Sequence, residues 1–271
     1  MGSMPAAFIA AHAHADDADL ARALVEHAGG LALRMRDDGL STDVKTSVSD
    51  VVTDADRAAE NFVAQALEAL RPEDGVVGEE GASRASSSGR TWVIDPVDGT
   101  YNFSRGSDYF CSALALVEGA PSNPDKILVG AVHRPAQGST WVAARGRATH
   151  NGSPLPQLED ARLEDLALAT YLHPRSMKDE AVRAAWTDAV RDAATIRMWG
   201  AGSVDLATVA AGGIGGWLQH SVADWDWLPG KALVEAAGGV ASKVEAGGVV
   251  WCVAGNRRVV ADVTARLANH V

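Results

Sequence analysis

Apolar side chains recur at helical spacing in several stretches of the chain. In the first stretch the apolar residues are Leu20, Leu24, Ala28, Leu31 and Met35. Their spacing predicts an amphipathic helix over residues 16–36. A second helix, with an apolar face through its middle, is expected to begin at Asp54 as its cap and to stop at Pro72.

Short apolar runs bounded by turn residues indicate strands between and after these helices. In the first half of the chain they lie at residues 76–77, 92–94, 112–117, 127–132 and 140–144. In the second half we predict strands at 166–170, 217–218 and 249–253, and helices at 178–192, 203–211, 229–237 and 257–268. Helices and strands mixed in both halves predict a layered α/β or α+β fold. Since no internal repeat or low-complexity linker divides the chain, we expect one domain over residues 1–271.

Composition narrows the classes of partner. The chain has 271 residues, of which 47% are hydrophobic, and this is enough apolar material for a substantial core. Its net charge is −11 and it has no basic stripe, so we expect neither a nucleic acid nor an anionic membrane surface as partner. An acidic protein can still bind phosphate when cations mediate the contact, which makes clustered carboxylates the feature to look for.

The expected compartment follows from the cysteines and from the apolar runs. No run approaches the roughly 20 apolar residues of a membrane span, and residues 1–7 lack the basic-then-apolar order of a secretion signal. Cys111 and Cys252 stand in apolar, strand-like surroundings and are expected to be reduced core thiols. We therefore predict a cytoplasmic protein.

The most informative stretch follows the short strand at residues 92–94. Asp95 leaves this strand, Pro96 prevents its simple continuation, and Asp98 returns three residues later, so a tight turn can aim both carboxylates at one point. Gly99 allows a close backbone approach, and the next amides can donate to phosphate oxygens. Two carboxylates beside exposed amides would repel a phosphate unless a hard divalent cation lay between them.

Other acidic residues could complete such a site, although each has an ordinary alternative. Glu79 and Glu80 follow a strand, but a Glu-Glu pair in a loop is usually solvated. Asp226 stands just before a predicted helix, where an Asp often serves as a cap, and Asp54 is expected to be only a cap. Asp56 opens the same helix as Asp54. The case therefore depends on the combination of these residues and on their order.

That order resembles the inositol monophosphatase family. The segments that carry the resemblance are Gly78-Glu79-Glu80, Asp95-Pro96-Val97-Asp98-Gly99-Thr100 with Asn102-Phe103, Trp225-Asp226 and Glu235-Ala236-Ala237-Gly238-Gly239. The resemblance extends from Lys45 to Asn256, and the central Asp-Pro-x-Asp-Gly-Thr motif is highly specific. It implies an α-β-α-β-α layered sandwich, often assembled as a homodimer, and a magnesium-dependent phosphatase that is sensitive to lithium.

The resemblance also implies a role for each matching residue. The first magnesium would be bound by Glu79, Asp95 and the main-chain carbonyl of Val97. The second would be bound by Asp95, Asp98 and Asp226, and a third, weaker ion is expected near Glu79.

Catalysis and substrate binding are expected from the same region. The resemblance implies that Thr100, together with Glu79 and Asp56, orients and deprotonates the attacking water. The amides of Gly99 and Thr100 would hold the phosphate, and Asp226 would also face the substrate. Metal ions lower the pKa of a bound water, so the reaction needs little help from side-chain acids and bases. This agrees with a site that has no obvious side-chain nucleophile.

The chain departs from the family pattern where substrates are selected. Gln219 stands where inositol-specific members have an acidic residue, and Ala201 stands where a threonine is expected. The reaction is thus better defined than the substrate. Inositol phosphate or a related sugar or polyol phosphate is the leading candidate, and histidinol phosphate is the alternative with the same chemistry. A non-catalytic protein that binds a phosphorylated metabolite is the alternative from another class.

Overall fold

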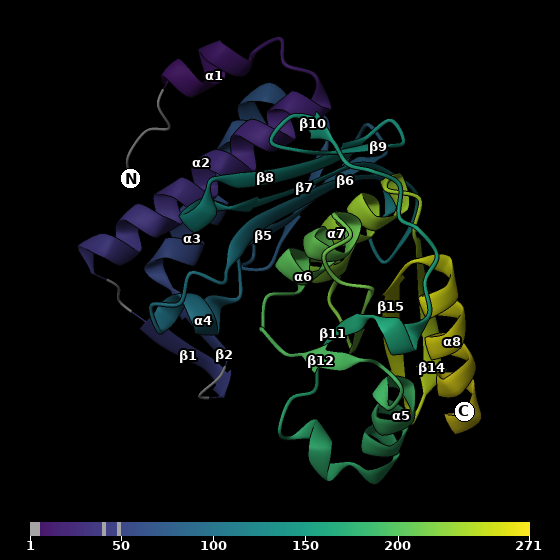
Figure 1. The fold of residues 1–271 in the computed structure, drawn as a ribbon. Helices are drawn as coiled ribbons and strands as arrows, with labels where there is room; N and C mark the ends of the chain where they lie inside the picture. The colour runs from purple at the N-terminus through teal and green to yellow at the C-terminus, as the bar shows by residue number, and fades with distance from the viewer. Residues whose placement is uncertain (1–5, 40–41, 48–49) are drawn as a thin grey trace.

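The computed structural model describes residues 6–39, 42–47 and 50–271, and the side chains of residues 42–47 and 50–52 lie outside this description (Figure 1). Lys45, the start of the family resemblance, lies in strand β1, and its side chain is among those left outside.

Two large sheets alternate with three layers of helices (Figure 1), and β1 and β2 form a separate two-stranded sheet. Helices α2 (Asp17–Asp38) and α3 (Asp54–Leu70) cover one face of an eight-stranded sheet. Helices α6 (Gly202–Ala210) and α7 (Asp224–Ala236) lie between this sheet and a five-stranded sheet. Helices α5 (Glu180–Val190) and α8 (Arg257–Leu267) cover the far face of the second sheet. The predicted α-β-α-β-α sandwich is therefore confirmed.

The strands of the eight-stranded sheet are antiparallel except for the β3–β5 pair. In spatial order they are β10 (Ser153–Pro154), β9 (Arg147–His150), β8 (Ser139–Ala144), β7 (Asn123–Arg134), β6 (Cys111–Ala120), β5 (Arg90–Asp98), β3 (Gly75–Gly78) and β4 (Ser83–Arg84).

The five-stranded sheet is mixed, because β11 runs parallel to both of its neighbours while β15 is antiparallel to both of its own. Its order is β12 (Thr195–Arg197), β11 (Ala167–Tyr171), β13 (Gly216–His220), β15 (Val249–Gly255) and β14 (Val240–Ala246). The remaining elements are β1 (Thr42–Ser47), β2 (Asp50–Thr53), α1 (Ala6–His12), α4 (Thr100–Ser104) and the 3-10 turns Pro135–Gln137, Leu163–Asp165, Ser176–Lys178 and Ala268–His270.

Strand β5 is the shared wall of two cores, since successive side chains of a strand point to opposite faces. Trp92 and Ile94 pack in the core under α2 and α3, whereas Val93 packs in the core shared with α6 and α7. All three side chains are essentially inaccessible to solvent. A strand fixed on both faces gives the residues at its end a well-defined position.

Two predicted helix starts were wrong. Helix α3 is capped by Thr53, whose hydroxyl and amide exchange hydrogen bonds with Asp56 in a capping box, while Asp54 is the first helical residue. Helix α7 begins at Asp224, and Pro229 lies inside it. Proline suits the first turn of a helix, which is the basis of the prediction. In the structure Pro229 is the sixth residue of α7, and it is buried together with Trp227 and Leu228.

The two cysteines, Cys111 and Cys252, are buried and free, as expected of core thiols. Among the described residues, no helix combines the length and the apolar character that crossing a membrane requires.

Candidate metal and phosphate site

A bulge in β5 brings two carboxylates to the same side of the strand end. Asp95 pairs with Ala113 and Asp98 pairs with Cys111, so three steps on β5 match two steps on β6. Without such a bulge, residues three apart on a strand would point to opposite faces. Pro96 lies within the bulge, and its carbonyl accepts a hydrogen bond from the buried Ser112 hydroxyl. The turn predicted from the sequence is thus a bulge locked by a neighbouring strand.

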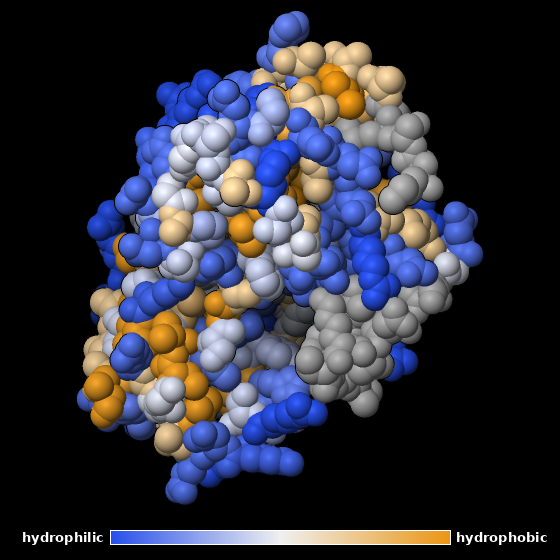
Figure 2. Space-filling model, turned by 180° about the vertical axis from the view of Figure 1, so that it is seen from behind, coloured by the Kyte–Doolittle hydropathy of each residue, from blue (hydrophilic) through white to orange (hydrophobic). Residues whose placement is uncertain are grey.

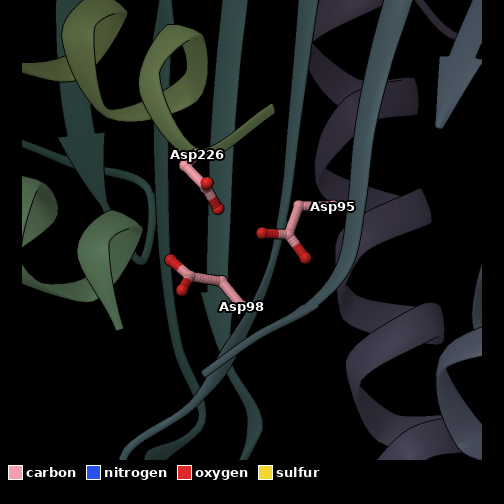
Figure 3. A group of neighbouring side chains, drawn as sticks. All are labelled: Asp95, Asp98 and Asp226. Carbon is pink, nitrogen blue, oxygen red and sulfur yellow. The ribbon is translucent and has the colours of Figure 1, made fainter. Parts of the chain in front are cut away.

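Asp226 reaches this point from the first turn of α7, across the interface between the sheet and the middle helices. Figure 3 shows the carboxyl groups of Asp95, Asp98 and Asp226 pointing toward one another. One carboxylate oxygen from each lies within 4.8 Å of the others. The structure therefore brings together three of the predicted metal ligands from distant parts of the chain.

Burial and mutual repulsion make it unfavourable for the three carboxyl groups of the cluster to be ionised together. Burial raises the pKa of Asp95 well above its ordinary value, and the charge of Glu79 adds to this effect. Burial also raises the pKa of Asp98. For Asp226, burial and then the charges of Asp98 and Glu79 raise the pKa to about 8. Such shifts show that the folded protein favours bound protons or cations here.

Asp98 has a second function, because its carboxylate receives the backbone amides at the start of α6. Gly202 N donates to Oδ1 at 3.2 Å, and Ser203 N donates to Oδ2. Helix α6 has no side-chain cap of its own, so Asp98 satisfies amides that helix geometry leaves without partners. The proposed metal centre is thereby joined directly to the 200–203 segment.

The loop that carries Glu79 is hydrogen-bonded to Glu60, a buried residue of α3. The Glu60 carboxylate accepts hydrogen bonds from the amides of Glu80 at 2.8 Å and Ala82 at 2.7 Å. A Cβ atom at Gly78 would lie only 2.3 Å from the same carboxylate, which explains the glycine. Sequence reasoning missed Glu60, although it stands four residues after Asp56 and so shares its helix face.

Thr100 and Asp56 meet beside the carboxylate cluster. The Thr100 hydroxyl lies 3.1 Å from Asp56 Oδ1 and 2.8 Å from the Val97 carbonyl. The other Asp56 oxygen accepts from the Thr53 amide at 2.9 Å. Burial raises the pKa of Asp56 despite its hydrogen bonds with Thr53. The structure thus unites three predicted residues, and it shows that Asp56 also caps a helix.

Gly99 packs closely against the backbone of Tyr109 and of Gly200. Its φ of +90° is a conformation that favours glycine. A Cβ atom there would approach Ala201 Cβ to 3.0 Å and the Gly200 carbonyl to 3.2 Å. Ala201 is buried against this glycine. Gly99 precedes the short helix α4, whose first amides have no acceptor within the helix.

A cavity of about 530 Å³ opens over this site. The predicted site residues that line it are Glu79, Asp98, Gly99, Thr100, Gln219 and Asp226. Asp56, Asp95 and Val97 are not among its lining residues, and all three are buried. On the rear face, the surface is hollowed between the part with the eight-stranded sheet and the part with the five-stranded sheet (Figure 2).

A second cavity of about 600 Å³ lies beside α7, among the turns of the eight-stranded sheet. It carries charges of both signs, including Lys126, Lys231 and Glu235. None of the three clustered aspartates lines it. We therefore place the chemistry in the smaller cavity.

Comparison with known proteins agrees with these features. The inositol monophosphatase family model matches residues 15–271. A histidinol-phosphatase of Mycobacterium tuberculosis is 35% identical over 237 residues, which are 83% of this chain and 86% of the relative. An inositol-1-monophosphatase of Bacillus subtilis is 27% identical over 233 residues, which are 84% of this chain and 85% of the relative. The crystal structure of extragenic suppressor protein suhB from Bartonella henselae matches with a TM-score of 0.82 and 27% identity, over 93% of this chain and 98% of that one.

Proposed function

The chain belongs to the inositol monophosphatase family and is a phosphomonoester hydrolase, and we propose that it works with magnesium at the cluster of Asp95, Asp98 and Asp226. The observation that carries this proposal is the convergence of three carboxylates, of which Asp95 and Asp98 are buried and Asp98 and Asp226 line one cavity.

The donor set fits a hard divalent cation. Among the described residues, Asp95 Oδ2 is buried and has no hydrogen-bond donor, while Oδ1 accepts from the Val97 amide at 3.1 Å. Carboxylate and carbonyl oxygens are the ligands that magnesium prefers. Asp95, Asp98 and Asp226 would hold one ion. Glu79, Asp95 and the Val97 carbonyl would hold another, and Glu79 would contact a third, weaker ion.

The metal ions would lower the pKa of a bound water and offset charge on the phosphate oxygens. The residues of the chain would orient and deprotonate the nucleophile. Thr100 Oγ would accept a hydrogen bond from the attacking water while its own proton points to Asp56 Oδ1. Glu79, which lines the same cavity as Thr100, would assist. The water oxygen would then bond to phosphorus while its proton passes through Thr100 to Asp56, and the ester bond would break as the leaving oxygen takes a proton from a solvent water.

Phosphate binding is assigned to the turn after β5. The amides of Gly99 and Thr100 would donate to phosphate oxygens, as the first turn of a helix commonly does. Asp226 would face the departing group from the opposite wall. Lithium at millimolar concentration is expected to inhibit by competing at the weaker metal position near Glu79.

Two substrate classes have support among the relatives. The Bacillus subtilis relative is named an inositol-1-monophosphatase, and the Mycobacterium tuberculosis relative a histidinol-phosphatase. We propose relaxed specificity, in which inositol phosphate or a similar polyol phosphate is accepted and not strongly preferred. Gln219 lies in the cavity where a carboxylate would bind vicinal hydroxyls better, and this favours the histidinol phosphate alternative.

The assembly and compartment are proposed as well. We expect residues 1–271 to act as one phosphatase domain, because both sheets contribute to the cavity. The family resemblance implies a homodimer, which sedimentation analysis can test. Two buried free cysteines support a cytoplasmic location.

The function is tested with purified protein, first stripped of metal by a chelator. We expect no hydrolysis of an aryl phosphate in the stripped state, and full recovery on addition of magnesium, with released phosphate as the readout. Binding of phosphate esters without any turnover in magnesium would favour the non-catalytic alternative instead. Measuring calorimetric magnesium binding alongside separates loss of metal from loss of chemistry.

A further inference from the structure

The outer part of the cavity has a different lining from its base. The ring-bearing side chains around it are Tyr101, Tyr171, His173 and Trp199. Tyr101 and Trp199 are 43% and 38% exposed, although Arg105 lies over the Tyr101 ring at 5.4 Å and Tyr109 packs on Trp199. Exposed rings grouped at the mouth of a site with a charged base indicate a surface that binds something flat and apolar.

Trp199 is held in place by several contacts. The Asn102 side-chain amide donates to the Trp199 carbonyl at 2.7 Å and also reaches the Gly200 carbonyl at 3.3 Å. The Trp199 ring packs on Tyr109, with ring centres 5.3 Å apart. Tyr109 is itself fixed, because its hydroxyl donates to the buried Asp205 at 2.5 Å. A ring that is ordered before binding loses little entropy when a ligand stacks on it.

Tyr171 and Gln219 also line this cavity. They are direct neighbours in the register of the parallel strands β11 and β13, at the carboxyl ends of both strands. Ligands commonly bind at this edge of parallel strands. Gln219 carries no charge, so the position beside Tyr171 lacks the strong acceptor that a ring of hydroxyl groups would use.

From these contacts we infer that the cavity binds the organic part of its substrate as a flat aromatic or heteroaromatic ring, stacked between Trp199 and the tyrosines Tyr101 and Tyr171. The inference rests on the proposed phosphatase function, since it assigns the leaving group of that reaction. Ring faces attract other ring faces in offset or edge-on arrangements beyond simple burial of area. A saturated ring of equal size gains the burial and lacks this additional attraction.

The first experiment compares two esters that differ only in the flatness of the ring. Phenethyl phosphate and cyclohexylethyl phosphate have the same linker and ring size, and imidazolylethyl phosphate tests a heteroaromatic ring. With magnesium present, we expect kcat/KM for both flat esters to exceed that for the cyclohexyl ester by up to about tenfold. Glycerol phosphate, which has no ring, reports on phosphatase activity alone.

Variants assign the preference to the cavity mouth. Trp199→Ala should bring the phenethyl to cyclohexylethyl ratio of kcat/KM close to one, and Trp199→Phe should keep most of it. Ile196→Ala is the matched control, because Ile196 is an exposed apolar residue of the neighbouring strand that does not line the cavity. It should leave the ratio unchanged. Sedimentation of each variant shows whether its association state has changed.

Binding of the non-hydrolysable phenethylphosphonate and cyclohexylethylphosphonate, measured by calorimetry, separates the two claims. If glycerol phosphate is hydrolysed and the flat and saturated esters react and bind equally, the ring subsite is wrong and the phosphatase stands. If nothing is hydrolysed but the phenethyl probe binds more tightly, the subsite stands and the phosphatase is wrong. Equal effects of Trp199→Ala and Ile196→Ala, together with a changed association state, would overturn the inference and assign these residues to a subunit interface.

Discussion

The base and the mouth of the cavity differ in the character of their side chains: the base is buried and charged, and the mouth is partly exposed and aromatic. At the base, Asp95 and Asp98 are buried and close to Asp226, so their charges must be offset by protons or cations. At the mouth, Tyr101 and Trp199 are partly exposed apolar rings. The clustered carboxylates at the base favour the binding of a hard cation. The mouth imposes no such demand and can vary without affecting the reaction.

The two regions also come from different parts of the fold. Four of the acids at or near the base, Glu79, Asp56, Asp95 and Asp98, lie on the first half of the chain and belong to or border the eight-stranded sheet. Much of the mouth comes from the second half of the chain, near the ends of β11, β12 and β13. The difference teaches that reaction and substrate choice are separable by mutation, and the following predictions test that separation.

The largest effect is expected at the base. Asp95→Asn removes a carboxylate shared by two proposed metal positions, so kcat/KM should fall by about a thousandfold or more. The metal-free variant should remain folded, since a buried like charge is removed. Asp54→Asn, which changes an exposed carboxylate of α3, is the control and should retain activity. Unchanged turnover of Asp95→Asn at saturating magnesium would rule out the ligand set.

A smaller effect is expected next to the base. Thr100→Ala removes the hydroxyl that lies 3.1 Å from Asp56 Oδ1, and kcat should fall by about a hundredfold with little change in KM. Thr100→Ser keeps a hydroxyl and should keep most of the rate. Steady-state kinetics on glycerol phosphate provide the measurement. An increase in KM alone would make Thr100 a binding residue.

A still smaller effect is expected at the mouth. Gln219→Glu restores a charged acceptor, so the ratio of kcat/KM for inositol phosphate over glycerol phosphate should rise by roughly tenfold. The rate on glycerol phosphate reports whether the base has been disturbed. An unchanged ratio, or a wild type that already prefers inositol phosphate strongly, would show that Gln219 does not select the substrate.

The smallest expected effect concerns the stability of the metal-free protein. The pKa of Asp226 rises from 3.8 to about 8 in the folded state, so between these values the folded protein binds a proton that the unfolded chain has lost. The free energy of unfolding should therefore fall as pH rises through this window, lowering the melting temperature by on the order of several degrees.

Magnesium should reverse this trend by replacing the proton, and it should stabilise more at the alkaline end of the window than at the acid end. Thermal unfolding with chelator and with magnesium measures both effects. Asp226→Asn should reduce the pH dependence of the chelated protein, and buried Asp205, with a pKa of about 7, should retain part of it. A melting temperature that rises across the window without metal would contradict the proposed cost of the charge cluster.

The residues at the base of the cavity were predicted from the sequence more completely than those at its mouth. The local conformation of the Asp-Pro-x-Asp-Gly-Thr motif can be predicted from its own residues, because the proline, the glycine and the spacing restrict a few adjacent backbone angles. The support from Glu60 and the cap by Thr53 were missed, since they depend on which side chain packs beneath a loop. Tyr109 and Asp205 were missed for the same reason, as neither belongs to a recognisable motif.

The amino-acid sequence by itself determined the layered fold class, the paired carboxylates at the end of β5 and the family, because these depend on periodicity and on short motifs. Only the tertiary structure decided that Asp98 receives the amides of α6, that Glu60 supports the loop of Glu79, and that Trp199 and Tyr171 line the same cavity. Such contacts join segments far apart in the chain. They arise when buried apolar faces stack the layers in one arrangement, and no local spacing encodes that arrangement.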